Sequence, residues 1–202
     1  DKDYLYIHDR LSVIDSILYC PQWLDEQAGY RSVIDDDSFV DWYIVNEISK
    51  NNDACFYTSC YMHLKRDGKL HMGPLWDYDL AYGNVDYNGN DSTAGFWIKD
   101  SGYYRRLFQD SLFVEKDRTR FNAYYDSRQK LYDFLDAQAS LLTPYALADA
   151  RIWGISVKNG LHRKKDAESL SDDELVKYYE TQVSNLKDWL ESRFKWLKGA
   201  LI

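Results

Sequence analysis

The sequence contains little cysteine and proline, and it has no long hydrophobic run. Three cysteines, Cys20, Cys55 and Cys60, are an odd number without CxxC spacing, so neither a disulfide framework nor a zinc site is expected. We expect them to be small buried side chains. Three prolines and the lack of an internal repeat favour one folding unit. No apolar run approaches the length of a membrane span, so no transmembrane segment is predicted in this chain.

Positive charge is also scarce. Lys and Arg number 25 against 33 Asp and Glu, for a net charge of -8, so no nucleic-acid partner is expected. Aromatic residues are abundant by contrast, with 18 Tyr and 7 Trp, which suits a large core or a surface for carbohydrate or peptide. The first residues, Asp1-Lys2-Asp3, are neither a signal peptide nor an initiator methionine. We therefore expect an excised or processed part of a longer protein.

Hydrophobic periodicity predicts helices in the first quarter of the chain. Apolar residues at helical spacing predict a helix over residues 4–19, and Pro21 follows as a stop. Ser38 and Asp41 form a near capping box that opens a second helix, which is expected to run to about Asn51. This second helix is apolar around most of its circumference, so we expect it to be central.

The period changes after Asp53. Short runs at 58–65 and 69–76 flank Asp67-Gly68, a two-residue signal that predicts a β-hairpin. With that turn, Thr58 is expected to lie opposite Asp77. The following segment, 77–101, is rich in Gly, Asn and Asp and is predicted to be a long loop.

The rest of the chain returns to helical patterns. Helices are predicted over residues 103–109 and 114–141, and the capping box Ser171–Glu174 opens a closing helix that continues to the terminus. The predicted fold class is mainly α with a small antiparallel β-hairpin.

Acidic residues gather at both ends of the predicted hairpin. Asn51-Asn52-Asp53 precedes it and Asp77-Tyr78-Asp79 follows it, so three carboxylates and two amides are expected to converge. Like charges at close range cost stability unless a cation or a shared proton compensates. A divalent cation that prefers oxygen, Mg²⁺ or Mn²⁺, is the simplest compensation.

The order helix, Asp, hairpin, Asp is also the order of the catalytic half of a protein kinase. Three further stretches carry a specific resemblance, and they are Ser38–Ile48, Lys50–Asp53 and Gly73–Leu80. They resemble the CotH kinase family over most of residues 30–130. The resemblance implies a protein-kinase-like C-lobe and ATP- and Mg- or Mn-dependent phosphorylation of Ser or Thr in a surface or spore-coat protein. It also implies a location outside the cytoplasm, secreted or on the cell surface.

The same resemblance implies residue roles. Asp53 is the expected catalytic base, Asp77 and Asp79 are the expected metal ligands, and Asn52 and Thr58 are the expected cofactor-binding residues. Thr58 stands where kinases place a metal-binding Asn, which leaves room for a non-catalytic member.

An N-lobe is not expected within these residues. No Gly-rich loop or strand-borne Lys precedes Asp53. We therefore expect residues 1–202 to be the C-terminal part of a CotH-type kinase domain with the N-lobe absent, inactive as a fragment.

Two alternatives stay open at this stage. The first is a non-catalytic secreted module that binds glycan or protein. The second concerns Asn84-x-Asp86-x-Asn88-Gly89, which imitates a calcium loop but has Gly95 where a bidentate Glu is required; a turn-rich connector is favoured there.

Glu47 falls on the apolar stripe of its helix and is expected to pair with Arg105 or Arg106.

Overall fold

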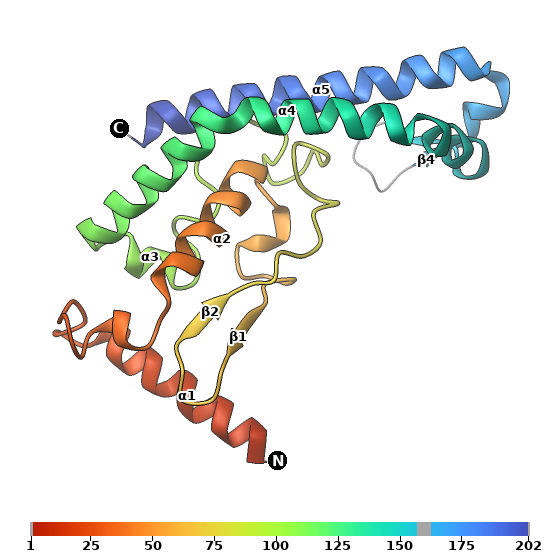
Figure 1. Cartoon of the computed structure of the whole chain (residues 1–202). Coiled ribbons are helices and arrows are strands. Elements are labelled where there is room, and N and C mark those ends of the chain that lie inside the picture. Colours follow the sequence, from red (N-terminus) through yellow and green to blue (C-terminus); the bar gives the residue numbers. More distant parts are fainter. Residues whose placement is uncertain (1, 157–162, 202) are drawn as a thin grey trace.

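The computed structural model describes residues 2–156 and 163–201 and is mainly helical (Figure 1). Its α-helices are α1 (Lys2–Tyr19), α2 (Asp36–Ser49), α3 (Tyr104–Leu107), α4 (Ser111–Trp153) and α5 (Asp172–Ala200). Short 3₁₀ turns are η1 (Tyr30–Ser32), η2 (Asn52–Ala54) and η3 (Lys165–Ser169). Two antiparallel pairs of strands are β1 (Met62–Leu64) with β2 (Leu70–Met72), and β3 (Ile155–Ser156) with β4 (Arg163–Lys164). The predicted fold class is confirmed, and the second strand pair was not predicted.

Helices α4 and α5 lie side by side and run antiparallel, and α2 packs beneath them (Figure 1). The β1–β2 hairpin and α1 lie at the other end of α2. The core is strongly aromatic, and its fully buried side chains include Tyr30, Phe39, Tyr104, Phe113 and Phe121. The far end of the α4–α5 pair has a small separate cluster around Ala150 and Leu175. The three cysteines are free and only partly buried.

Helix α2 begins earlier than the sequence pattern predicts. Its N-cap is Asp35, whose side chain accepts a hydrogen bond from the Ser38 amide at 2.9 Å. Ser38 was expected to be the cap, but Asp is an equally good cap and the acidic residues Asp36 and Asp37 favour the first turn. The predicted capping box of α5 is confirmed, with Ser171 and Glu174 bonding reciprocally.

Helix α4 runs beyond its predicted end at residue 141, through Pro144 to Trp153. A proline removes one helical hydrogen bond and usually ends or kinks a helix. Here the segment after Pro144 gains packing that offsets this loss, because Leu147 and Ala150 belong to an apolar cluster with Ala167 and Leu175. The helix predicted over 103–109 is shorter than expected and is α3.

The β1–β2 hairpin forms, but its predicted register is wrong by one residue. Met62 pairs with Met72, and Leu64 pairs with Leu70. The connection spans residues 65–69 rather than a two-residue turn, with the Gly68 amide donating to the Lys65 carbonyl at 2.8 Å. A slip of one residue turns every side chain to the other face. Thr58 is therefore not the partner of Asp77.

A buried ion pair joins α2 to α5. Arg193 is fully buried, and its Nη2 lies 2.7 Å from Glu47 Oε1. Glu47 also accepts the amides of Trp97 at 2.5 Å and Ile98 at 2.8 Å. Arg193 donates to the carbonyls of Thr93 and Gly95 at 2.9 and 2.7 Å. The pair thus fastens the long loop 77–101 to the helical core.

The expected pairing of Glu47 with Arg105 or Arg106 is therefore wrong. Arg105 donates to the Asp100 carbonyl, and Arg106 donates to the Leu18 carbonyl. The true partner, Arg193, follows Glu47 by 146 residues, so helical spacing on α2 carries no signal for it.

Asp117 on α4 is a second buried carboxyl group near this pair. It is fully buried, and neither carboxyl oxygen has a hydrogen-bond partner among the described residues. Burial, with a smaller contribution from the charge of Glu47, raises the pKa of Asp117 to about 7. The ordinary pKa of this carboxyl group, which applies in the unfolded chain, is 3.8. Between pH 3.8 and about pH 7, Asp117 therefore carries a proton in the native state that it has lost in the unfolded state.

Folding stability should therefore fall as pH rises from about 4 to about 7 and then level off. Asp117→Asn removes this dependence. We therefore expect the unfolding free energy of the variant, relative to that of the wild type, to be about 2–3 kcal/mol higher at pH 8 than at pH 5. Urea titrations at the two pH values measure this difference. Asp133→Asn, at an exposed position of the same helix, is the control, and an equal effect of Asp117→Asn at both pH values would contradict the assignment.

Candidate functional site

Hydrogen bonds join the segment that carries Asp53 to the segment that carries Asp77 and Asp79. The Asn51 side-chain amide donates to the Asp77 carbonyl at 3.1 Å, and the Asn52 backbone amide donates to the Leu80 carbonyl at 2.9 Å. Beyond them, the Tyr82 amide donates to the Ser49 carbonyl at 2.7 Å. The two ends of the hairpin region are therefore held together by backbone and amide contacts.

Asp53 lies on η2, directly after α2. The helix ends because Lys50 adopts a left-handed conformation with φ 45°, and Asn51 then caps η2 by accepting the Asp53 amide at 3.2 Å. The Asn52 side-chain amide donates to Asp53 Oδ1 at 3.0 Å. The Asp53 carboxylate is half-buried and orientated by its neighbour.

Asp77 and Asp79 are exposed, and the residue between them points inward. The Tyr78 hydroxyl donates to Asn46 Oδ1 on α2 at 2.9 Å, and Asn46 is buried. Asp77 adopts a left-handed conformation with φ 62°, a region that Asp tolerates better than most residues. The anchor at Tyr78 thus leaves the carboxylates on its two sides exposed to solvent.

Thr58 and Ser59 follow η2 on the approach to the hairpin. Thr58 is exposed, and its backbone amide donates to the Asp53 carbonyl at 3.5 Å. Ser59 Oγ donates to Asp77 Oδ2 at 3.4 Å. Ser59 rather than Thr58 therefore contacts the Asp77 side chain.

Comparison with known families identifies the family of this chain. The family model described as CotH kinase protein matches residues 13–197, which is most of the chain. The chain belongs to the CotH kinase protein family. No curated protein and no solved structure matches it. Membership in this family implies a kinase-like function that uses ATP and acts on a protein.

The CotH site has polar residues that sequence reasoning missed. Lys50 and Asn90 link the long loop to Asn52, since Asn90 Nδ2 donates to the Lys50 carbonyl at 3.0 Å and lies 3.4 Å from Asn52 Oδ1. Asn88 Nδ2 also donates to Asn52 Oδ1, at 3.3 Å. Asn52, predicted to bind cofactor, is therefore engaged with both the loop and Asp53. The Asn-rich composition of 84–90 was the available signal, and it was interpreted as a calcium-like pattern.

A metal ion fits this site only together with other ligands. In the described part of the chain, no three His, Cys, Asp or Glu side chains are placed to hold a metal by themselves. Mg²⁺ in kinases needs one or two carboxylates and completes its shell with phosphate oxygens and water. Asp77 and Asp79 satisfy this requirement because their carboxylates are exposed. The donor set suits a metal that arrives with phosphates.

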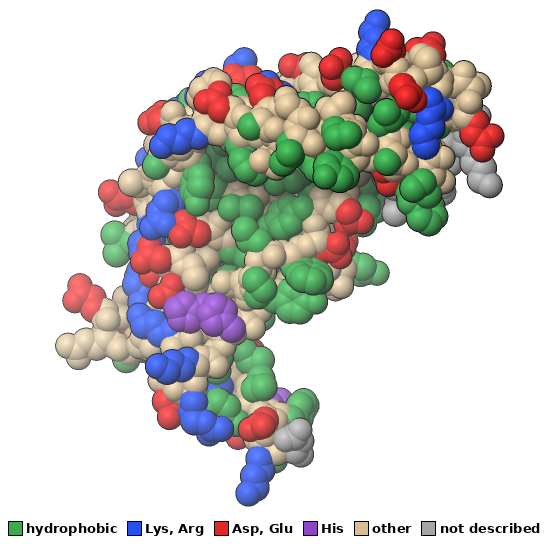
Figure 2. Space-filling model, turned by 45° about the vertical axis from the view of Figure 1, so that its right-hand side comes forward, with side chains coloured by type: hydrophobic (Ala, Val, Ile, Leu, Met, Phe, Trp, Pro, Cys, Tyr) green, Lys and Arg blue, Asp and Glu red, His purple; other side chains and the backbone are tan. Residues whose placement is uncertain are grey.

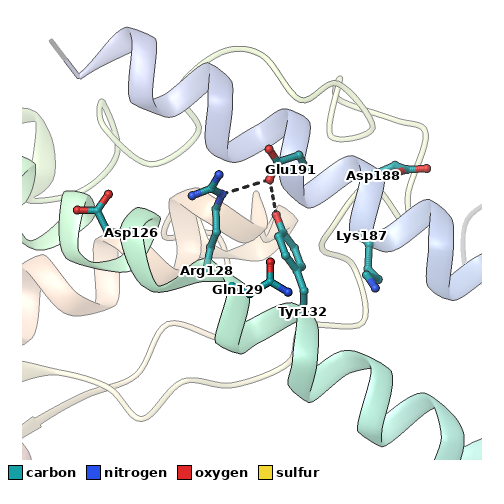
Figure 3. Close-up of a pocket in the computed structure, with 7 residues that line it drawn as sticks. All are labelled: Asp126, Arg128, Gln129, Tyr132, Lys187, Asp188 and Glu191. Atoms are coloured by element: carbon teal, nitrogen blue, oxygen red, sulfur yellow. Dashed lines mark hydrogen bonds and ion pairs between the residues drawn. The ribbon is translucent and has the colours of Figure 1, made fainter.

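The surface hollows found between the helices lie away from these carboxylates. One of about 400 Å³ lies between α4 and α5, where Arg128 and Tyr132 point toward Glu191 (Figure 3). Its charged side chains already bond one another, with Tyr132 Oη 2.8 Å from Glu191 Oε2. Neither this hollow nor the one lined by Lys116 and Arg120 includes a candidate site residue. Asp53, Asp77 and Asp79 are therefore candidate site residues because of their chemistry, and no hollow described above supports them.

No helix among the described residues has the length and apolar character required to cross a membrane.

Proposed function

We propose that this chain supplies the acidic half of a site that transfers the γ-phosphoryl group of ATP to a Ser or Thr hydroxyl of a protein. The observation that carries the proposal is the fastening of Asp53 to the Asp77 segment through Asn51 and Asn52. In phosphoryl transfer the protein contributes positioning and charge neutralisation rather than covalent chemistry. A fixed pair of carboxylates on two joined segments meets that need.

Each carboxylate has a distinct task in this proposal. Asp53 accepts the proton of the substrate hydroxyl. At the same time the hydroxyl oxygen bonds to the γ-phosphorus, and the bond between the γ-phosphorus and the ADP oxygen breaks. Asp77, with Asp79 beside it, holds Mg²⁺ or Mn²⁺, which when bound neutralises charge on the phosphates. Asn52 donates a hydrogen bond to Asp53 Oδ1 and so orients this carboxylate. The reaction leaves a phosphoserine or phosphothreonine and ADP.

Exposed aromatic side chains beside Asp77 favour a protein as the acceptor. Tyr61 and Trp76 are 48% and 57% exposed, and their rings meet edge to face at 6.0 Å. Figure 2 shows hydrophobic side chains gathered on the middle of one face of the molecule, with acidic side chains beside them. Exposed aromatic groups are typical of protein contact surfaces.

We further propose that these residues correspond to the C-lobe of the kinase domain. The described residues before Asp53 form helices and a 3₁₀ turn without a strand. The Gly-rich loop that covers the phosphates and the strand-borne Lys are then supplied from outside residues 1–202.

The metal role is tested by comparing two substitutions in the full-length protein. Asp77→Asn removes a charged ligand, so we expect the Mg²⁺ or Mn²⁺ concentration for half-maximal transfer to rise at least about tenfold. Asn84→Ala removes an uncharged side chain that bonds the Asp79 carbonyl. It should change the metal concentration for half-maximal transfer by less than about threefold. Metal titrations of the transfer rate measure both, and an equal loss would assign the metal to the Asn-rich loop instead.

A further inference from the structure

The side chain of Lys50 is a buried cation inside the long loop. Lys50 is only 3% exposed, and its ammonium group lies among backbone carbonyls of residues 89–94. Lys50 Nζ is 3.0 Å from the Gly89 oxygen, 2.9 Å from the Ser92 oxygen and 3.0 Å from the Ala94 oxygen. An ammonium group has three donors. All three are therefore used by one turn of this loop.

This arrangement explains the calcium-like pattern in the sequence. Two of the side chains at the pattern's ligand positions bond other groups, since Asn84 bonds the Asp79 carbonyl and Asn88 bonds Asn52. The loop's backbone carbonyls converge instead, and the group at their centre is the Lys50 ammonium. A compact positive charge at this point serves as a bound cation would in a carbonyl-lined loop.

A continuous set of hydrogen bonds connects this cation to the proposed base. Asn90 lies within the turn that surrounds the ammonium, and its side-chain amide donates to the Lys50 carbonyl and to Asn52 Oδ1. Asn52 then donates to Asp53 Oδ1 at 3.0 Å. Asn90 is 1% exposed. The orientation of Asp53 thus depends on a loop whose shape depends on the Lys50 charge.

We propose that Lys50 is an internal cation that orders residues 84–97, and that it acts as a positioning residue for Asp53 through Asn90 and Asn52. The ordering role does not depend on the phosphoryl-transfer assignment. The effect on transfer rests on the proposed function.

The decisive experiment replaces the cation and then supplies it again. In Lys50→Ala, amide hydrogen exchange of residues 84–97 should accelerate at least about tenfold, because charge-assisted hydrogen bonds are lost from a buried turn. Ethylammonium chloride should restore slow exchange, since it brings a charged group with three donors into the space left by the side chain. Tetramethylammonium chloride at equal concentration carries the charge without donors and should not restore it.

Transfer activity gives the second readout. In Lys50→Ala of the full-length protein, kcat should fall about 100-fold with little change in the KM for ATP, as expected for a displaced catalytic group. Ethylammonium should raise kcat of Lys50→Ala again. Leu190→Ala, which opens an apolar cavity in the core, is the control, and ethylammonium should not help it. Wild-type protein without any transfer activity would refute the proposed function while the exchange result still decides the loop proposal.

Lys50→Met covers the case in which Lys50→Ala does not fold. It keeps an aliphatic stem and removes only the ammonium, so its exchange in 84–97 should also accelerate at least about tenfold. Exchange as slow as in the wild type in either variant would overturn the proposal. So would faster exchange in Lys50→Ala that tetramethylammonium restores as well as ethylammonium does.

Discussion

Asp53→Asn in the full-length protein is expected to lower phosphate transfer by about 10²–10⁴-fold while leaving the fold intact. The substitution removes the proton acceptor, yet its amide oxygen still accepts the hydrogen bond from Asn52. The loss should therefore appear in kcat, with the KM for ATP little changed. Steady-state kinetics with far-ultraviolet circular dichroism of the same samples measure both parts.

The matched control for Asp53→Asn is Asp133→Asn, an exposed position on α4 far along the chain. It makes the same change in charge and should keep wild-type transfer. Autophosphorylation of Asp53→Asn at the wild-type level in a mass-spectrometric assay would refute the assignment of Asp53 as base.

Arg193→Met is expected to destabilise the protein by about 3–5 kcal/mol, the cost of leaving a buried charge without its partner. Glu47 would keep the Trp97 and Ile98 amides but lose its cation. Burial already raises the pKa of Glu47 and lowers the pKa of Arg193, because water is excluded from both groups. A loss of this size is a large share of the stability of an ordinary domain.

Urea unfolding at neutral pH measures this loss, and Arg128→Met is its control. Arg128 of α4 pairs with Glu191 of α5, but both side chains are about 30% exposed (28% and 31%), so about 1 kcal/mol or less is expected. Equal losses in the two variants would show that the Glu47–Arg193 pair does not anchor the long loop.

Local patterns predicted the helical part of this fold well. Helical spacing located α1 to within two residues of its start, and Ser171 with Glu174 located the start of α5. These signals are short-range, since caps and helical stripes are decided within one or two turns. The prediction ended α4 at residue 141, because the packing of Leu147 and Ala150 in a cluster with Leu175 of α5 is a tertiary effect.

The candidate site was predicted in composition but not in its contacts. The chain order placed Asp53 and Asp77 at the two ends of one hairpin, and the bonds of Asn51 and Asn52 do join those segments. The register was wrong because Asp67-Gly68 was interpreted as a two-residue turn, whereas the connection is longer. Lys50 was overlooked because its partners are backbone carbonyls about 40 residues away (39–44), and carbonyl positions leave no trace in side-chain spacing.

The most direct test of the central claim is transfer of isotopically labelled γ-phosphate from ATP by the full-length protein, followed by mass-spectrometric mapping of the label. The account predicts labelled phosphoserine or phosphothreonine that requires Mg²⁺ or Mn²⁺ and disappears with EDTA and in Asp53→Asn. Label that forms equally well in Asp53→Asn, or wild-type protein that transfers none to any protein, would contradict it.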